Sequence, residues 1–351
     1  MDRIKSLGIF IIFSLLFFVA TTSISAQALP TVGANMASYQ QPTGANCNIN
    51  VPAQYSTIQA GIDASNNGDT VCVAAGTYNE NVIINKSIRL SGSGVTQSTI
   101  VGQITENVPG YYTLFVSAGG SNSTVEGFYI KGVGTHPDNY AVQWSDASLS
   151  LVTFRYNWII SGNGGLDLGL DGQPTNGLFS NNIFEGNNSP RLAIGGGNNI
   201  DFLNNTFMGT VTSSAQVLGM ASINSLVKRN TFVMTGMIGG ILIRTDWSTI
   251  INENNLEGGT NLKVNNYPSG GTLNAENNWW GDNDPSNNID GDVDYIPFVT
   301  VPFPEYPLPS FNQPPVANAG IDQVVNEDQQ VNFDGSGSTD PDGNSDIVSY
   351  S

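Results

Sequence analysis

The sequence contains few charged residues and few of the side chains that usually carry acid–base chemistry. Charged residues make up 11% of the 351 residues, and the chain has one histidine and two cysteines. So little charge argues against a bundle of charged helices. Glycine, by contrast, occurs 40 times. Gly and Asn tolerate the left-handed backbone of sharp turns, so the composition favours a folded chain of short strands.

Basic residues are scarce as well, with 11 Lys and Arg against 29 Asp and Glu, which gives a formal net charge of −18. A surface of this sign repels phosphate backbones and anionic lipid, so we expect no nucleic-acid partner. The same repulsion disfavours a polyanionic substrate. The simpler explanation of the charge is that an acidic surface keeps a secreted protein soluble.

Only one long apolar run occurs, near the N-terminus. It extends from Leu7 to Ala20, follows Arg3 and Lys5, and leads into small residues that fit a cleavage site. This order predicts a signal peptide over residues 1–28 and a secreted or cell-surface protein. The run is shorter than the ~20 residues of a spanning helix, so we expect no membrane span in the mature chain.

Cys47 and Cys72 lie close together in the sequence. In an oxidising compartment two thiols in one small region are expected to pair, so the sequence predicts one disulfide. Two unpaired, buried thiols are the alternative. Closing this loop would stabilise the fold by about 3 kcal/mol, because it restricts the unfolded chain.

A short phrase recurs along the chain, in which a polar turn containing Asn precedes an apolar pair. The repeated Asn residues are 23 or 25 positions apart, a spacing too long for a hairpin and typical of one turn of a three-sided coil. Stacked coils would align these residues in a ladder, where each amide donates to one neighbour and accepts from another. The predicted ladder comprises Asn157, Asn182, Asn205, Asn230, Asn255 and Asn278.

The two ends of the repeat region differ from its middle. Ser56 begins a capping-box pattern, and Ile58 and Ile62 recur at helical spacing, so we expect a short helix that covers the first coil. At the other end, Trp279 and Trp280 indicate a terminal plug, after which residues 299–313 form a proline-rich linker.

Several phrases at the start of the coils resemble the pectin-lyase-like superfamily. They are Thr57–Ile62, Gly68–Val71, Ala75–Glu80 and Asn81–Ile84. The resemblance implies an all-β fold, a right-handed three-sided parallel β-helix with an N-terminal capping helix over residues 47–298, after an N-terminal extension of residues 29–46.

Residues 314–351 resemble the start of a PKD domain, an immunoglobulin-like β-sandwich common in secreted bacterial proteins. The phrases Pro314–Gly320 and Asp334–Gly343 carry this resemblance. Because such a sandwich needs roughly seven strands over ~100 residues, we expect this truncated, partial sandwich not to fold as a complete domain.

Enzymes of the pectin-lyase-like superfamily place their residues on the outer face of one sheet. In the strand after each Asn turn, alternation predicts that Gln143, Asp167, Ala193, Leu242 and Lys263 face outward. Asp167 and Lys263 would be about four coils apart, or ~19 Å, which is too far for one acid–base pair. We find no carboxylate pair on adjacent coils.

The opening phrase also resembles pectin methylesterases, a resemblance that implies two catalytic Asp and an Arg. Residues 199–203 are similar to one of the expected surroundings, but Asp201 lies inside an ordinary repeat and no partner motif precedes it. His136, the one histidine, lacks the flanking glycines of polygalacturonases. The sequence therefore disfavours both activities.

Trp144 and Trp247 could stack on sugar rings, although either could instead fill a loop core. Acidic and basic side chains near them could bind hydroxyl groups. The predicted carbohydrate groove comprises Trp144, Asp167, Asp171, Arg191, Arg244, Asp246 and Trp247.

Asp290, Asp292 and Asp294 have part of the spacing of a calcium loop, but the Gly and Glu that complete such a loop are absent, and a solvated turn is the alternative. We expect no other cofactor. The sequence predicts a monomeric, non-catalytic module that displays a groove for carbohydrate or another extracellular partner. The alternative is a polysaccharide lyase or glycoside hydrolase that acts on pectin-like or other polysaccharides.

Overall fold

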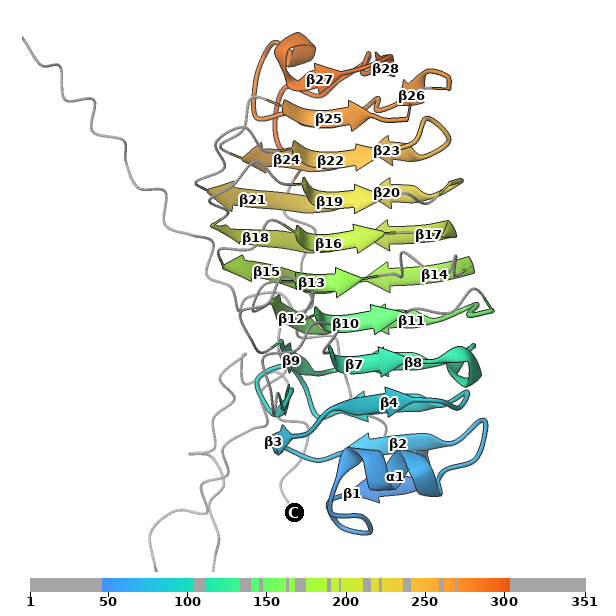
Figure 1. Cartoon of the computed structure of the whole chain (residues 1–351). Coiled ribbons are helices and arrows are strands. Elements are labelled where there is room, and N and C mark those ends of the chain that lie inside the picture. The colour runs from blue at the N-terminus through green and yellow to red at the C-terminus, as the bar shows by residue number, and fades with distance from the viewer. Residues whose placement is uncertain are drawn as a thin grey trace, which may run out of the picture. The chain divides into compact units, whose positions relative to one another are not determined.

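The chain winds into a parallel β-helix, as predicted from the sequence. The computed structural model describes residues 46–103, 112–132, 140–144, 148–161, 164–167, 175–187, 191–195, 197–210, 216–220, 223–235, 241–258, 262–268 and 270–303. Figure 1 shows the strands stacked coil upon coil, with the helix α1 at the N-terminal end. The predicted signal peptide, nearly all of the N-terminal extension, most of the linker and the PKD-like part lie outside the described residues.

Three parallel sheets form the sides of the helix in the described part of the chain. Sheet A holds 11 strands, namely β1 (Ile49–Val51), β2 (Thr70–Val73), β5 (Arg89–Gly92), β8 (Thr124–Glu126), β11 (Thr153–Arg155), β14 (Thr175–Ser180), β17 (Asn198–Leu203), β20 (Leu226–Lys228), β23 (Ile250–Asn252), β26 (Leu273–Asn274) and β28 (Val293–Asp294). Sheet B holds β3 (Gly76–Asn79), β6 (Ser98–Val101), β9 (Tyr129–Lys131), β12 (Trp158–Ser161), β15 (Ile183–Asn187), β18 (Thr206–Thr210), β21 (Thr231–Thr235) and β24 (Asn255–Gly258).

Sheet C holds β4 (Val82–Ile84), β7 (Tyr112–Val116), β10 (Tyr140–Trp144), β13 (Gly164–Asp167), β16 (Arg191–Gly195), β19 (Gln216–Met220), β22 (Ile241–Thr245), β25 (Leu262–Asn266) and β27 (Ile289–Asp290). Each described coil passes from sheet C through sheet A to sheet B. Among the described residues, helices are few and short, and none is long and apolar enough to cross a membrane.

Like side chains stack along the axis and fill the core. Phe184, Phe207 and Phe232 lie in register on β15, β18 and β21, and their rings stack with centroids 4.9 Å and 4.5 Å apart. All three are fully buried. Since aromatic rings favour such stacking beyond the burial of their area, the column helps to hold successive coils in register.

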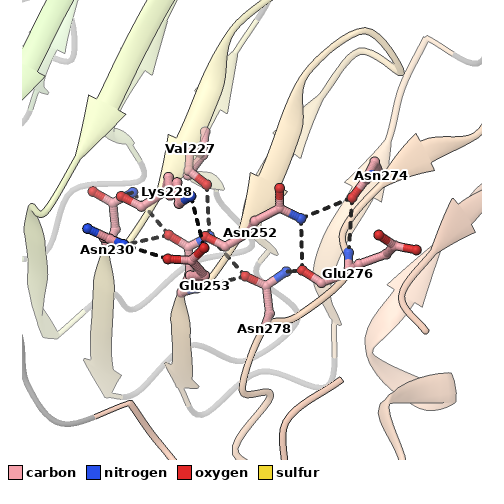
Figure 2. Close-up of polar contacts among 10 residues, drawn as sticks. Val227, Lys228, Asn230, Asn252, Glu253, Asn274, Glu276 and Asn278 are labelled. Atoms are coloured by element: carbon pink, nitrogen blue, oxygen red, sulfur yellow. Dashed lines mark hydrogen bonds and ion pairs between the residues drawn. The ribbon is translucent and has the colours of Figure 1, made fainter. Parts of the chain in front are cut away.

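A ladder of buried Asn side chains lies at the turn between sheets A and B. The Oδ1 atom of Asn205 accepts from the backbone N of Asn182 at 2.9 Å, and its Nδ2 donates to the carbonyl oxygen of Phe179 at 2.9 Å. The same pattern repeats on every coil of the ladder, of which Figure 2 shows the C-terminal end around Asn230 and Asn278. The members are Asn157, Asn182, Asn205, Asn230, Asn254 and Asn278.

The prediction that Asn255 belongs to this ladder is wrong by one residue. Asn254 is the member, while Asn255 begins β24 and exchanges two hydrogen bonds with the backbone of Phe303. The left-handed backbone also lies one residue earlier than the ladder Asn itself. The residues that directly precede the six ladder Asn all have φ between 55° and 60°, and they are Tyr156, Asn181, Asn204, Arg229, Glu253 and Asn277. The ladder positions therefore need Asn for its amide group and not for its backbone freedom.

The helix α1 (Ile58–Ala64) covers the first coil, as predicted. Its N-cap is Thr57, whose side chain accepts from the backbone N of Ala60. The Glu80 carboxylate accepts from two further backbone amides of the first helical turn, those of Ile58 and Gln59, at 2.8 Å and 2.9 Å. The helix packs closely because Gly61 has no side chain: a Cβ there would lie 2.9 Å from Val51.

The predicted disulfide between Cys47 and Cys72 is present. It ties the chain just before β1 to β2, so it closes the first coil beneath α1. At the other end, Trp280 is fully buried and packs edge-on against Tyr295, with ring centroids 6.3 Å apart. Trp279 is only half-buried, so Trp280 is the tryptophan that plugs the core.

We expect the substitution Asn205→Ala to lower the free energy of unfolding by about 3 kcal/mol, the upper end of the cost of an unsatisfied buried donor. The reason is that the backbone N of Asn182 loses its acceptor. Chemical denaturation would measure the loss. Asn287→Ala is the matched control, since Asn287 is exposed. Equal stability of the two variants would contradict a structural role for the ladder.

Candidate functional site

One row of residues runs along the outer face of sheet C, one residue from each coil. The strand register aligns Phe115, Gln143, Asp167, Ile194, Gly219, Arg244, Asn265 and Asp290. We call this set the outer row. The residues just before it in the strands, such as Leu114, Val142 and Leu218, are fully buried. Because side chains alternate along a strand, the row members whose side chains the structure describes, such as Gln143 and Arg244, face away from the core.

The N-terminal part of the outer row combines an aromatic pair with polar residues. Tyr112 and Phe115 stack with centroids 4.6 Å apart, and both are half-buried. Gln143 lies on the next coil and is also half-buried. Asp167 follows in register with Gln143, so their Cα atoms lie about one strand spacing, ~4.8 Å, apart.

The C-terminal part of the outer row carries a cation and two exposed aromatic rings. The Arg244 guanidinium lies 4.2 Å above the centre of the Tyr267 ring. Tyr267 is 57% exposed and Trp247 is 45% exposed. Gly270 and Gly271 make room for the Trp247 indole, since a Cβ at Gly270 would lie 2.3 Å from its Nε1. Flat aromatic surfaces of this kind can pack against the C–H faces of sugar rings.

The structure contradicts the predicted role of Trp144 in a groove. Trp144 is 1% exposed and stacks on Phe179 in the core, with ring centroids 5.0 Å apart. Since Gln143 faces outward, its neighbour Trp144 must face inward. Of the two tryptophans, Trp144 fills the core and Trp247 is the exposed one.

Three residues predicted to face outward do not join the outer row. Leu242 is fully buried, and Lys263 is 5% exposed, with its Nζ donating to the Leu256 carbonyl oxygen at 2.9 Å. Burial lowers the pKa of Lys263, while Asp282 and Glu257 oppose that shift. Ala193 lies in register with the buried Leu218. Both Leu242 and Lys263 lie at the corner between sheets B and C, so simple alternation fails there.

The other predicted groove residues have separate places. Asp246 closes the turn after β22, where its Oδ1 accepts from the backbone N of Ser248 at 2.8 Å. Arg191 begins β16 in register with Gln216. Asp171 lies outside the described residues. Asp201 lies on β17 in sheet A, away from the outer row, and burial raises its pKa although a hydrogen bond from the Leu226 backbone opposes the shift.

The three carboxylates proposed for calcium each have their own partner. Asp290 accepts from Asn265 Nδ2 at 2.7 Å, and Asp292 accepts from Thr272 Oγ1 at 2.8 Å. Asp294 accepts from the backbone N of Ile296 at 3.3 Å. No group of three or more His, Cys, Asp or Glu side chains within the described ranges could hold a metal ion.

Tyr267, Tyr112 and Phe115 were not among the predicted site residues. A signal for Tyr267 was present, because it follows Arg244 by 23 residues, the length of one coil. Such a spacing places the two residues on adjacent coils. Tyr112 and Phe115 precede the first ladder Asn. The repeat phrase therefore could not predict which residues of the next coil they align with.

No protein-family model matches the sequence, and no curated protein matches it. Solved structures do match. A pectin methylesterase from Aspergillus niger shares 14% identity and covers 77% of this chain and 95% of its own, with a TM-score of 0.49. One from carrot shares 14% identity over 68% of this chain and 75% of its own, with a TM-score of 0.47. PemA from Erwinia chrysanthemi shares 13% identity over 68% and 82%, with a TM-score of 0.39.

The described residues form a parallel β-helix of three sheets. At these identities the likeness concerns the fold. The prediction of a non-catalytic module is nevertheless wrong: the matching structures are those of catalytic esterases, and its alternative, an enzyme that acts on a polysaccharide, is the better supported of the two. Because a fold hosts many activities, the chemistry has to be argued from this chain's own residues.

The two tryptophans give a direct test of which face each occupies. Trp144→Ala should lower the free energy of unfolding by about 3–5 kcal/mol, because it empties a core site. Trp247→Ala should change the stability much less, by about 0.5–1 kcal/mol, because the residue is 45% exposed and lies outside the core. Denaturant unfolding of both variants would measure the difference, and a large loss for Trp247→Ala would refute its surface role.

Proposed function

We propose that this protein is a secreted enzyme that acts on a pectin-like polysaccharide, which it binds along the outer row of sheet C. The shape of the row supports this proposal. From Phe115 to Asp290 the register spans seven coil steps, or ~34 Å at the strand spacing. An aromatic pair lies at one end, and the Tyr267 ring lies against Arg244 towards the other. A long row that includes half-buried and exposed side chains and bears aromatic surfaces suits a chain of sugar rings.

The pairing of Gln143 with Asp167 on adjacent coils is the observation that favours one reaction, the hydrolysis of an ester on the polymer. Asp167 would act as general base and take a proton from a water molecule that attacks the ester carbon. The Gln143 amide would donate to the oxyanion that forms. The intermediate then releases the alkoxide, which takes the proton back from Asp167. One water is consumed, and one acid and one alcohol are formed.

Hydrolysis of a glycosidic bond fits the outer row less well. That reaction normally uses two carboxyl groups roughly 5–9.5 Å apart. The two carboxylates of the outer row, Asp167 and Asp290, are separated by five coil steps, or ~24 Å. A single carboxylate beside an amide is sufficient for ester hydrolysis, which is why we favour it.

Incubation of the full chain with methyl-esterified pectin tests the proposal. We expect release of methanol without new reducing or unsaturated ends. Asp167→Asn should lower the rate by about 100-fold or more, since it removes the general base. Asp201→Asn is the matched control, because Asp201 lies on sheet A, and it should retain the activity.

Two outcomes would overturn the proposed reaction. Chain cleavage without methanol release would indicate a lyase or a glycoside hydrolase in its place. Methanol release that is equally fast in Asp167→Asn would remove Asp167 from the mechanism.

A further inference from the structure

After the last coil the chain turns back onto the outer face of sheet B. Val299 bridges Trp279, which in turn bridges Asn255 on β24, so Val299 lies two coil steps beyond β24. Four residues later the chain has returned to β24, where the backbone N of Phe303 donates to Asn255 Oδ1 at 2.9 Å and its carbonyl oxygen accepts from Asn255 Nδ2 at 3.0 Å. Between Val299 and Phe303 the chain therefore runs towards the N-terminal coils.

The outer face of sheet B carries a row of neutral side chains that leads from this anchor to two aromatic rings. Each member precedes a buried core residue in its strand, as Thr206 precedes Phe207, so the row faces outward. We call this set the sheet B row. The strand register aligns Asn255, Thr231, Thr206, Ile183, Trp158 and Tyr129.

The aromatic end of the sheet B row is held in place by a hydrogen bond. Tyr129 and Trp158 meet edge to face with ring centroids 5.4 Å apart, and both are half-buried. Trp158 Nε1 donates to Glu185 Oε2 at 2.9 Å, which fixes the indole. Ile160 and Met208, the register partners of Glu185, are half-buried apolar neighbours. Surfaces lined with aromatic side chains bind proline-rich segments in the extended polyproline II conformation.

The sequence directly after Phe303 fits this surface in composition and in length. Residues 304–315 contain five prolines and a single charged residue. Trp158 lies four coil steps from Asn255, or ~19 Å. At ~3.1 Å per residue, about six residues of polyproline II cover that distance, which brings Pro309 to Trp158. One further coil step brings Phe311 to Tyr129.

We propose that residues 304–311 dock along the sheet B row as a polyproline II segment, with Pro309 on Trp158 and Phe311 on Tyr129. The anchor at Phe303 favours this occupant over a free partner, because it gives the segment a high effective concentration at the row. A net charge of −18 disfavours a second copy of the chain as the occupant. The docking is independent of the proposed reaction. It leaves the outer row of sheet C open to a polymer.

Cross-linking in the full chain tests the position of the segment. Thr206 lies two coil steps from Asn255, or ~10 Å, which places it opposite Tyr306. The double variant Thr206→Cys with Tyr306→Cys, treated with a short bismaleimide, should form a bridge within one chain, quantified by peptide mass mapping. The control pair is Thr153→Cys on sheet A with Tyr306→Cys, and it should react at least about 10-fold more slowly. Equal rates for the two pairs would overturn the inference, as would a covalent dimer in place of the internal bridge.

Limited proteolysis of the full chain tests the aromatic contacts. Chymotrypsin can cleave after Phe311, because Asn312 and not proline follows it. Trp158→Ala should speed this cleavage about 10-fold, since it raises the fraction of chains with the segment undocked. Trp247→Ala is the control and should be cleaved like the parent.

Cleavage after the buried Phe207 reports unfolding of the coils and separates that effect from release of the segment. Cleavage after Phe311 that is equally fast in the parent and in Trp158→Ala would refute the docking. If Trp158→Ala also exposes Phe207, the cross-linked pair decides, because it retains Trp158.

Discussion

The hydrogen-bonded stacking of each coil on the next in fixed register is the constraint on which the rest of the structure depends. The hydrogen bonds between parallel strands hold the register along the three sheets. The buried Asn ladder reinforces it at the corner between sheets A and B. Each ladder amide accepts from the coil before it and donates to a carbonyl oxygen of that same region, as Asn182 does with Asn157 and Phe154. A slip of one residue would leave these buried groups unpaired, and each would carry a cost of about 1–3 kcal/mol.

The same register determines the form of the candidate site. Because each coil contributes one residue to the outer row, groups on adjacent coils are 21–28 residues apart in sequence, as Gln143 and Asp167 are at 24. The site is consequently a line on a flat face. Such a face offers length and repeated contacts, which suits a polymer better than a small molecule. Its chemistry depends on which side chains fall at successive coils, and here an amide and a carboxylate precede a lone cation.

Much of this architecture could be predicted, because it depends on periodicity. The regular spacing of Asn predicted the coils, and the pattern around Ile58 and Ile62 predicted the capping helix that is observed. The errors lie where two neighbouring residues compete for one position. Asn254 and Asn255 are the same residue type, and the repeat phrase could not show which of them enters the ladder. Trp144 and Gln143 are adjacent, and which one faces the core depends on the phase of the strand.

The sequence by itself determined the coil length, the apolar core and the closure of the first coil by a helix and a disulfide. Those features follow from local pattern and composition. Only the tertiary structure decided which residues share a face. Which side chains of a short strand point inward depends on how the strand stacks on the coil beneath it, and not on its own few residues. The sequence indicated Arg244 as a candidate, but it did not indicate Tyr267, Gly219 or Gln216. Stacking brings Arg244 into register with Gly219 on the adjacent coil, and the glycine leaves the space that the Gln216 amide occupies.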